Sequence, residues 1–189
     1  INGDGIINTL DRKVVGNLRP TVTGGWSTTL SYKNLSLYAR FDYALGHTIY
    51  NDLKARSMGQ FQGQFNLIDK VKDMWSEDNP NSKYPVFTYA DQLNKHNIWR
   101  GNSIFYEKAD YMALREITLS YNLPKQWTKA LQMSNASVYL TGQNLFYITG
   151  YDGASPEPPA GASPEPSDGF DYGRYPSPRT LIFGLNITF

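Results

Sequence analysis

Five segments of this chain alternate apolar and polar residues with a period of two, and this pattern limits the folds open to it. The segments cover about residues 21–32, 35–45, 104–123, 136–149 and 179–189. In the second segment, Leu37 and Phe41 fall on one face and Ser36 and Tyr38 on the other. Successive side chains of a strand point to opposite faces. The sequence therefore predicts an all-β, antiparallel sheet with one apolar face and one polar face.

The connections between these segments alternate between short and long. Residues 33–34 form a two-residue turn and 124–135 a short connection, whereas 46–103 and 150–178 are long. Residues 1–20 are a further loop, rich in Asn, Asp and Gly. Apolar spacing predicts an amphipathic helix within the first long connection, at about 52–75. The upper part of the third segment is out of phase, which indicates a β-bulge.

Composition excludes several classes of protein. The 189 residues include no cysteine, which rules out a disulfide scaffold and thiolate metal sites. A formal net charge of +1 gives no electrostatic case for a nucleic-acid partner. No run of about 18 consecutive apolar residues is present, so a transmembrane helix is not expected. The chain is nevertheless rich in aromatic residues, at 14%.

Two architectures fit the alternation. In a soluble β-sandwich the apolar face forms the core, whereas in a membrane β-barrel it meets lipid. The alternating connection lengths favour the barrel, as do aromatic residues near strand ends, such as Tyr32, Tyr121 and Phe189. Because the smallest membrane barrels need about eight strands, we expect the other strands to come from an N-terminal part of the same polypeptide.

Several motifs resemble one family of membrane proteins. They are Asn-Gly-Asp-Gly-Ile-Ile-Asn at 2–8, Leu-Ser-Tyr-Lys-Asn-Leu at 30–35, Asp-Asn-Pro-Asn-Ser-Lys-Tyr-Pro at 78–85, Arg-Glu-Ile-Thr-Leu-Ser-Tyr-Asn-Leu-Pro at 115–124, Thr-Gly-Gln-Asn-Leu-Phe at 141–146 and Tyr-Pro-Ser-Pro-Arg-Thr at 175–180. On these motifs the chain resembles the C-terminal part of the SusC/RagA-type TonB-linked outer-membrane transporters of the Bacteroidota.

The resemblance implies a fold, a function and partners. The chain would supply the last five strands of a plugged barrel of about 22 strands, with long loops outside the cell and a periplasmic C-terminus. Such a protein is not an enzyme but imports oligosaccharides or peptides. Its partners would be a SusD-like surface lipoprotein, TonB (through the N-terminal part), outer-membrane lipid and the barrel insertion machinery. The alternative from the residues alone is a soluble calcium-binding β-sandwich, such as a carbohydrate-binding module.

The N-terminal segment fits part of a calcium loop, which alternates oxygen ligands around a glycine turn. The candidate ligands are Asn2, Asp4, the Ile6 carbonyl, Asn8 and Asp11. An Asx-rich turn without metal is the alternative. No other cofactor is expected, because His47 and His96 lie too far apart in sequence for a zinc motif.

The remaining candidate sites follow from the predicted faces and loops. Polar residues expected to face the barrel lumen are Arg40, Asp42 and Glu116. External-loop aromatics that could contact a ligand or the lid are Trp75, Tyr84, Tyr89 and Trp99. The final strand carries apolar residues expected to act as a C-terminal insertion signal: Phe183, Leu185, Ile187 and Phe189.

Overall fold

The structure is a computed structural model that describes residues 3–4, 9–60, 66–86, 102–157 and 169–189, with only the backbone at 9, 59 and 60. The chain forms two compact units. The first, here called the loop unit, comprises Ile1–Arg19, His47–Ala109 and Tyr151–Arg174. The second, the sheet unit, comprises Pro20–Gly46, Asp110–Gly150 and Tyr175–Phe189. Among the described residues, no helix is long and apolar enough to cross a membrane.

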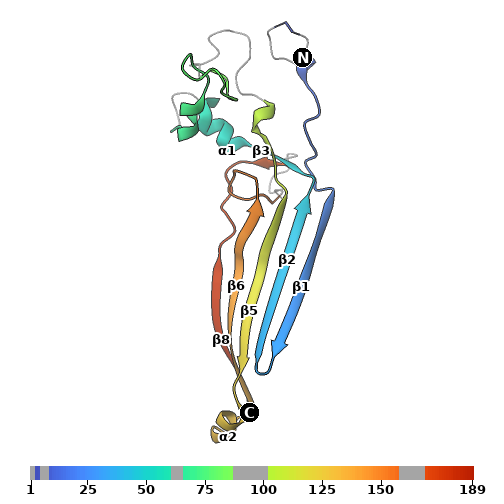
Figure 1. Cartoon of the computed structure of the whole chain (residues 1–189), viewed down its shortest axis with the longest axis vertical. Helices are drawn as coiled ribbons and strands as arrows, with labels where there is room; N and C mark the ends of the chain where they lie inside the picture. The colour runs from blue at the N-terminus through green and yellow to red at the C-terminus, as the bar shows by residue number, and fades with distance from the viewer. Residues whose placement is uncertain (1–2, 5–8, 61–65, 87–101, 158–168) are drawn as a thin grey trace. The chain divides into compact units, whose positions relative to one another are not determined.

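The sheet unit is a five-stranded antiparallel sheet, which confirms the predicted antiparallel β-structure (Figure 1). Its strands, in spatial order, are β1 (Val22–Tyr32), β2 (Leu35–Leu45), β5 (Tyr111–Asn122), β6 (Asn135–Thr149) and β8 (Thr180–Thr188). Each strand pairs with the next strand of this sheet along the chain. The topology is therefore an up-and-down meander.

The register gathers the apolar residues of all five strands on one face. Directly paired residues share a face in an antiparallel sheet. Leu37 of β2 pairs with Leu119 of β5, which pairs with Leu140 of β6 and then with Phe183 of β8. On β1, Trp26 pairs with Phe41, and their rings stack with centroids 4.4 Å apart.

A bulge interrupts β5 and β6 at the position where the alternation loses its phase. Arg40 pairs with Glu116 and Phe41 with Leu114, so Arg115 has no counterpart on β2. On the other side β6 bulges as well, and Asn144 adopts a positive φ of 51°. Strict alternation would put Leu114 and Ile117 on opposite faces, because they are three positions apart. The bulge keeps both on the apolar face.

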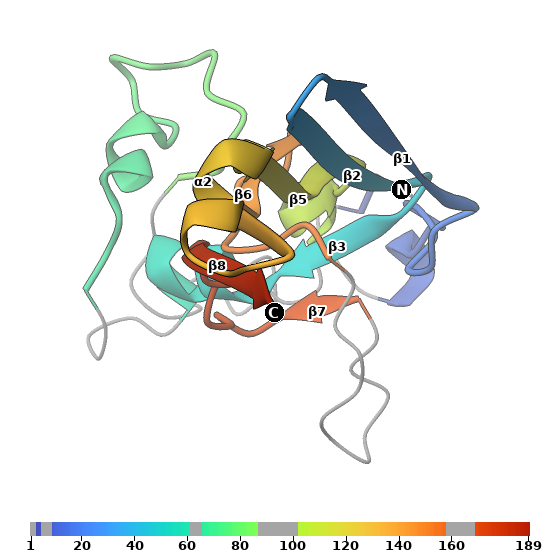
Figure 2. The same cartoon turned by 90° about the horizontal axis from the view of Figure 1, so that it is seen from below.

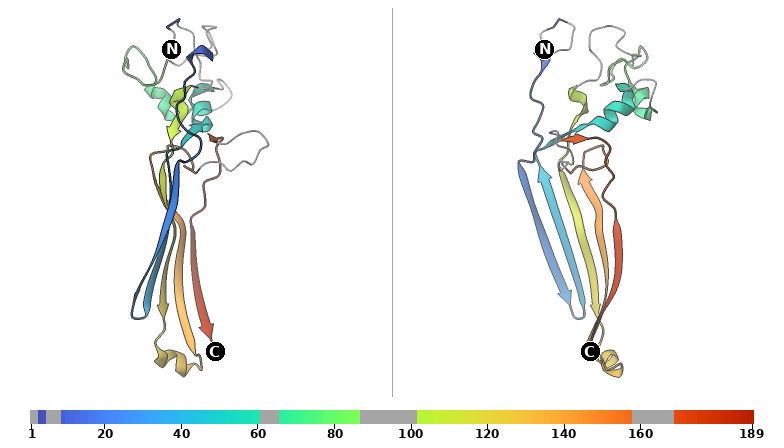
Figure 3. Two further views of the ribbon diagram at one scale, coloured as in Figure 1. Left: turned by 90° about the vertical axis from the view of Figure 1, so that its right-hand side faces the viewer. Right: turned by 180° about the vertical axis from the view of Figure 1, so that it is seen from behind.

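The two short connections lie at one end of the sheet. Lys33 and Asn34 join β1 to β2, and Lys33 has a φ of 53°. Between β5 and β6 lies the short helix α2 (Lys125–Ala130). Seen from below and from the sides, α2 lies beside the C-terminal end of β8 (Figure 2 and Figure 3).

The loop unit combines a small sheet with short helical turns. Its three-stranded sheet has the order β4 (Tyr106–Lys108), β3 (Thr48–Asn51) and β7 (Phe170–Asp171). Its helical elements are η1 (Thr9–Asp11), α1 (Asp52–Ala55), the π-type turn η2 (Arg56–Gln60), η3 (Asp69–Asp73) and η4 (Ser103–Phe105). The core is apolar and includes Tyr50, Met58, Met74, Tyr84 and Phe105.

Two expected elements differ from the structure. Within the described residues of the helix expected at 52–75, helical backbone covers Asp52–Gln60 and η3, and Ile68, before η3, has extended backbone with φ −85° and ψ 159°. Gly59, a residue type of low helical propensity, lies near the end of the first helical stretch. The strand expected at 104–123 is divided: β4 joins the small sheet, while β5 joins the large one. Between them, Ala109 donates its N–H to the carbonyl of His47 over 3.1 Å.

Candidate functional site

The apolar face of the sheet unit is exposed rather than covered by a second layer. Large side chains in the middle of it remain open, with Trp26 51%, Leu140 50% and Phe183 75% exposed. The four residues expected as an insertion signal, Phe183, Leu185, Ile187 and Phe189, are all exposed on this final strand and its end. A soluble sandwich would bury such a face as its core. This surface therefore has the character of a face that contacts an apolar medium.

The opposite, polar face has a charged cluster at the β-bulge. Arg115 donates from Nε to both carboxylate oxygens of Asp42, each over 2.8 Å. Its Nη1 donates to the hydroxyl of Tyr147 over 3.0 Å, and the guanidinium also lies over the Tyr147 ring. Arg115 is only 18% exposed. A charge-assisted and geometrically fixed pair of this kind is much stronger than an exposed one.

A second polar group lies one register step further along β2 and β5. Arg40 Nη2 is 4.0 Å from Glu116 Oε2, and the Arg40 side chain is 55% exposed. Thr118 donates to Glu116 over 3.3 Å and shares a 2.7 Å hydrogen bond with Thr141 of β6. The predicted lumen-facing residues thus lie on one face, where the structure pairs Arg40 with Glu116 and gives Asp42 a different partner, Arg115.

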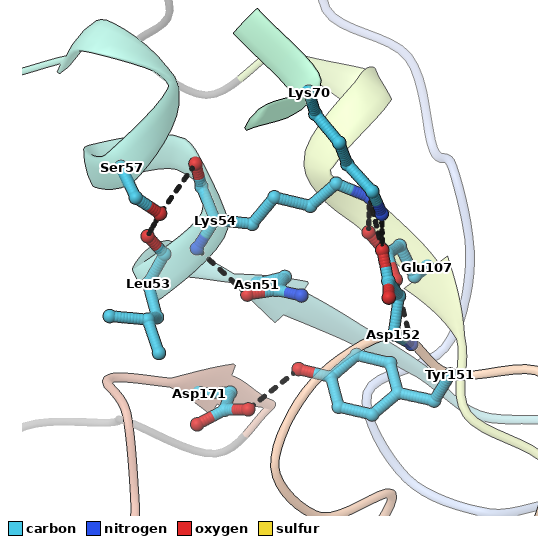
Figure 4. Close-up of polar contacts among 9 residues, drawn as sticks. All are labelled: Asn51, Leu53, Lys54, Ser57, Lys70, Glu107, Tyr151, Asp152 and Asp171. Atoms are coloured by element: carbon cyan, nitrogen blue, oxygen red, sulfur yellow. Dashed lines mark hydrogen bonds and ion pairs between the residues drawn. The ribbon is translucent and has the colours of Figure 1, made fainter. Parts of the chain in front are cut away.

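The loop unit has a charged cluster around the buried Lys54 that connects segments far apart in sequence (Figure 4). Lys54 of α1 is 9% exposed, and its Nζ donates to Glu107 over 2.6 Å and to Asp152 over 3.2 Å. Asp152 also pairs with Lys70. Burial lowers the pKa of Lys54, but the hydrogen bond and charge of Glu107 outweigh this, so its pKa is raised. Lys54 is therefore held in its charged form.

Beside this cluster, Tyr151 is hydrogen-bonded to Asp171 (Figure 4). The Tyr151 hydroxyl donates to Oδ2 of Asp171 over 2.7 Å, and Oδ1 accepts from the backbone N–H of Gly173 over 3.0 Å. Burial and the adjacent carboxylate together raise the pKa of Tyr151 well above the usual range for tyrosine. Tyr151 therefore stays neutral and acts as a fixed donor.

The external-loop aromatics are only partly described. Trp75 is half-exposed, and its N–H donates to the carbonyl of Tyr84 over 3.1 Å. Tyr84 is buried in the core of the loop unit. Tyr89 and Trp99 lie outside the described residues. Their contact with a ligand or lid stays a prediction.

The predicted calcium ligands are also only partly described. Asn2, Ile6 and Asn8 lie outside the described residues, while Asp4 and Asp11 lie within them. In the described part of the chain, no group of three or more His, Asp and Glu side chains comes together. His47 is buried, with Nε2 2.9 Å from the Pro156 carbonyl, and His96 is not described. The calcium hypothesis stays a prediction.

Several residues of these clusters were not identified from the sequence. Arg115 falls on the apolar face if strict alternation is assumed, and only the bulge brings it to Asp42. The out-of-phase stretch at 112–115 was the available signal. For the cluster around Lys54, Glu107 and Asp152 the sequence offers no signal, because these residues lie in three separate segments without periodic structure.

Known TonB-dependent receptors are similar to the chain over its whole length. The TonB-dependent receptor P26 of Formosa agariphila is 35% identical over 191 residues, which include 100% of this chain and 19% of the relative. The TonB-dependent receptor SusC of Bacteroides thetaiotaomicron is 25% identical, again over 100% of this chain and 17% of the relative. No family model matches the chain.

A solved structure gives the same result for the fold. The structure of the RagAB peptide transporter matches 93% of this chain and 18% of that one, with a TM-score of 0.75 and 27% identity. Over its whole length the chain is thus similar to TonB-dependent receptors. The resemblance to the SusC/RagA type is confirmed, and the chain spans about a fifth of the length of these relatives.

Proposed function

We propose that this chain is a section of the wall of a TonB-dependent outer-membrane importer of the SusC/RagA type. The observation that carries the proposal is the continuous, exposed apolar face of the sheet unit, opposite a polar face. In a membrane barrel, the apolar face meets lipid and the polar face meets the lumen. Transport rather than catalysis fits the relatives, which are named as receptors and transporters.

The strand lengths support a membrane location. The strands of the sheet have 11, 11, 12, 15 and 9 residues. A tilted strand needs about 9–11 residues to cross the hydrocarbon core. In the described part of the chain, β1 pairs only with β2 and β8 only with β6. Because an unpaired strand edge in lipid is very costly, further strands would pair with both edges of this sheet. A barrel of about 22 strands has room for a plug in its lumen.

The lengths of the connections support one orientation of the sheet in the membrane. Short turns at one end and a large loop unit inserted between strands are the pattern of barrels with periplasmic turns and extracellular loops. In this arrangement Lys33 and α2 face the periplasm, and the loop unit is extracellular. The lumen-facing residues Arg40, Asp42 and Glu116 would then contact the plug, the cargo or each other.

The partners and cargo are proposed from the relatives. A SusD-like surface lipoprotein would cover the extracellular side, and TonB would act through other parts of the full protein. The cargo would be a peptide or an oligosaccharide; the RagAB structure is described as a peptide transporter. The exposed ring of Trp75 in the loop unit is a surface on which either class could pack.

Uptake by the native organism tests this proposal. A strain without the full-length gene should fail to take up either labelled oligopeptides or labelled oligosaccharides, and complementation should restore uptake only with a working TonB and proton gradient. The native protein should fractionate with the outer membrane and co-purify with a surface lipoprotein. A native protein near the mass of this chain, 21.4 kDa, in the soluble fraction would overturn the proposal.

A further inference from the structure

The helix α2, between β5 and β6, exposes large apolar side chains and buries a polar one, the opposite of an ordinary surface helix. Trp127 and Leu131 are 57% and 65% exposed, whereas Thr128 is 1% exposed. Leu131 is the C-cap of α2, four positions after Trp127, so the two exposed side chains lie near one side of the helix. A helix in water normally buries such residues.

The chain on both sides of α2 is fixed to the end of the sheet. The N–H of Leu123 donates to the Ala136 carbonyl, and that of Ser134 to the Thr188 carbonyl, each over 2.8 Å. Within the turn, Met133 donates to the Thr128 carbonyl over 2.9 Å. Both ends of the connection that holds α2 are therefore fixed to the end of the sheet, while Trp127 and Leu131 stay exposed.

The charge of this end suits an anionic surface. Lys125 and Lys129 are exposed on α2, and Lys33 lies 5.3 Å from the centroid of the Tyr32 ring in the other short turn. Neither short connection, 33–34 or 123–134, contains an Asp or a Glu. Lysine next to exposed Trp and Tyr is the composition of a membrane–water interface.

The depth of α2 also matches such an interface. Strand β5 ends at Asn122, and the helix begins three positions later at Lys125. At about 3.3 Å per residue, this places α2 within about 10 Å of the end of the sheet. The headgroup layer beyond the hydrocarbon core is about 5–8 Å thick on each side. A sheet that spans the core thus places α2 among headgroups.

We infer that α2 is an interfacial anchor in the phospholipid leaflet on the periplasmic side of the outer membrane. Trp127 and Leu131 contact the boundary of the acyl chains, and Lys125 and Lys129 contact headgroup phosphates. This inference rests on the proposed function, because it requires that the sheet crosses a bilayer. It assigns a lipid contact to a turn that would otherwise be a simple connection.

Site-directed spin labelling tests the anchor in the full-length protein, otherwise free of cysteine, in nanodiscs of phosphatidylethanolamine and phosphatidylglycerol. Labels are placed singly at Leu131→Cys, at the neighbouring polar position Gln126→Cys, and at the apolar sheet face, Leu119→Cys. Oxygen partitions into lipid, whereas a nickel chelate stays in water. We expect the oxygen-to-nickel accessibility ratio to be several-fold higher at 131 than at 126, and to approach the ratio at 119.

Each other result has a defined meaning. A ratio at 131 equal to that at 126 places the helix in water and overturns the anchor. Protection of 131 from both reagents means that protein covers it, which also overturns the anchor. In either case a lipid-exposed label at 119 leaves the proposed function intact, whereas a water-exposed label at 119 removes both proposals.

A second variant, Lys125→Gln with Lys129→Gln, should reduce the oxygen-to-nickel ratio at 131 in these nanodiscs, and no change would contradict the phosphate contact.

Discussion

At the scale of single residues, two arginines on the polar face have opposite energetic importance. Arg115 donates to Asp42 with two 2.8 Å bonds and is 18% exposed, whereas Arg40 is 55% exposed and 4.0 Å from Glu116. Exposed pairs contribute about 0–1 kcal/mol, because water and salt screen them. The sequence alone singles out Arg40 as a polar-face residue and not Arg115, which only the bulge brings to Asp42.

Replacing Arg115 should therefore destabilise the sheet more than replacing Arg40. We expect Arg115→Ala to lower the free energy of unfolding by about 1–3 kcal/mol, because Asp42 loses its charged donor. Arg40→Ala is the matched control, with an expected cost below about 1 kcal/mol. Unfolding of the full-length protein in detergent, followed by heat-modifiable gel mobility, measures both. Equal midpoints for the two variants would contradict this ranking.

Tyr151 gives a pH-dependent prediction. Its pKa is raised in the folded state, so its contribution to stability is complete below the ordinary value of 10.0 and is lost as pH rises above it. The stability of the loop unit should thus fall above about pH 10, by up to about 1.4 kcal/mol per pH unit from this group. Tyr151→Phe should flatten that alkaline slope, as monitored by protease resistance between pH 9 and about pH 11. An unchanged slope would show that Tyr151 does not titrate with unfolding.

At the scale of elements, tyrosine rings lie directly over glycines of the neighbouring strand. Gly184 of β8 pairs with Tyr139 of β6, and Gly24 of β1 pairs with Tyr43 of β2. A methyl group on Gly184 would overlap the Tyr139 ring. A ring over a glycine fills the space that the missing side chain leaves and fixes the register.

A double-mutant cycle measures this contact. Gly184→Ala should cost about 1–3 kcal/mol of unfolding free energy, because the Tyr139 ring must move. In a Tyr139→Ala background the same change should be nearly neutral, which gives a coupling energy of similar size. Gly150→Ala is the control, since nothing lies within 4 Å of the added methyl. Additive costs would mean that the ring moves freely.

The buried Lys54 acts as a clamp that holds three segments of the loop unit together. Lys54 joins α1 to Glu107 of β4 and to Asp152 in the second long connection. Because its pKa is raised, this pairing is present below the ordinary value of 10.5 and is lost only as pH rises beyond it. At neutral pH the clamp is intact.

Removing the lysine charge should open the loop unit. We expect Lys54→Met to cost about 1–3 kcal/mol, because two carboxylates then face each other without their shared cation. Lys72→Met is the control, since Lys72 and Asp69 are 81% and 95% exposed. Limited proteolysis of the full-length protein should show faster cleavage at 66–86 or 150–157 in the first variant only. Equal cleavage rates would contradict the clamp.

Strands with a regular alternation of apolar and polar residues could be predicted from the sequence, whereas segments without such a pattern could not. The alternating segments at 35–45 and 136–149 closely match β2 and β6, because every second side chain reports the face of a strand. The single helix expected at 52–75 is interrupted by extended backbone at Ile68, because Met58 and Met74 pack into a compact core and not along one helical face. The clamp at Lys54 depends on tertiary packing that no local pattern encodes.

At the scale of the whole molecule, the two sides of the sheet should respond oppositely to a new charge. Trp26 and Ser27 are neighbours in the middle of β1 on opposite faces. In a bilayer, Trp26→Lys should cost about 2–4 kcal/mol, the value for a lysine facing lipid near the midplane. Ser27→Lys should be tolerated. Refolding yield of the full-length protein into phospholipid vesicles compares them, and equal losses would argue against a lipid-facing side.

The meander has a consequence for how freely the loops can vary in length. The two long connections leave and re-enter the sheet between strands that already pair. The first runs from Leu45 of β2 to Tyr111 of β5, which pairs with Ala44, and the second from Thr149 of β6 to Thr180 of β8, which pairs with Gln143 of β6. The entropy of closing a loop grows only with the logarithm of its length, so doubling a connection costs about 0.6 kcal/mol. Insertions that enlarge the loop unit are therefore cheap compared with one broken strand pair. Recognition surfaces can be exchanged on this scaffold while the wall keeps its register.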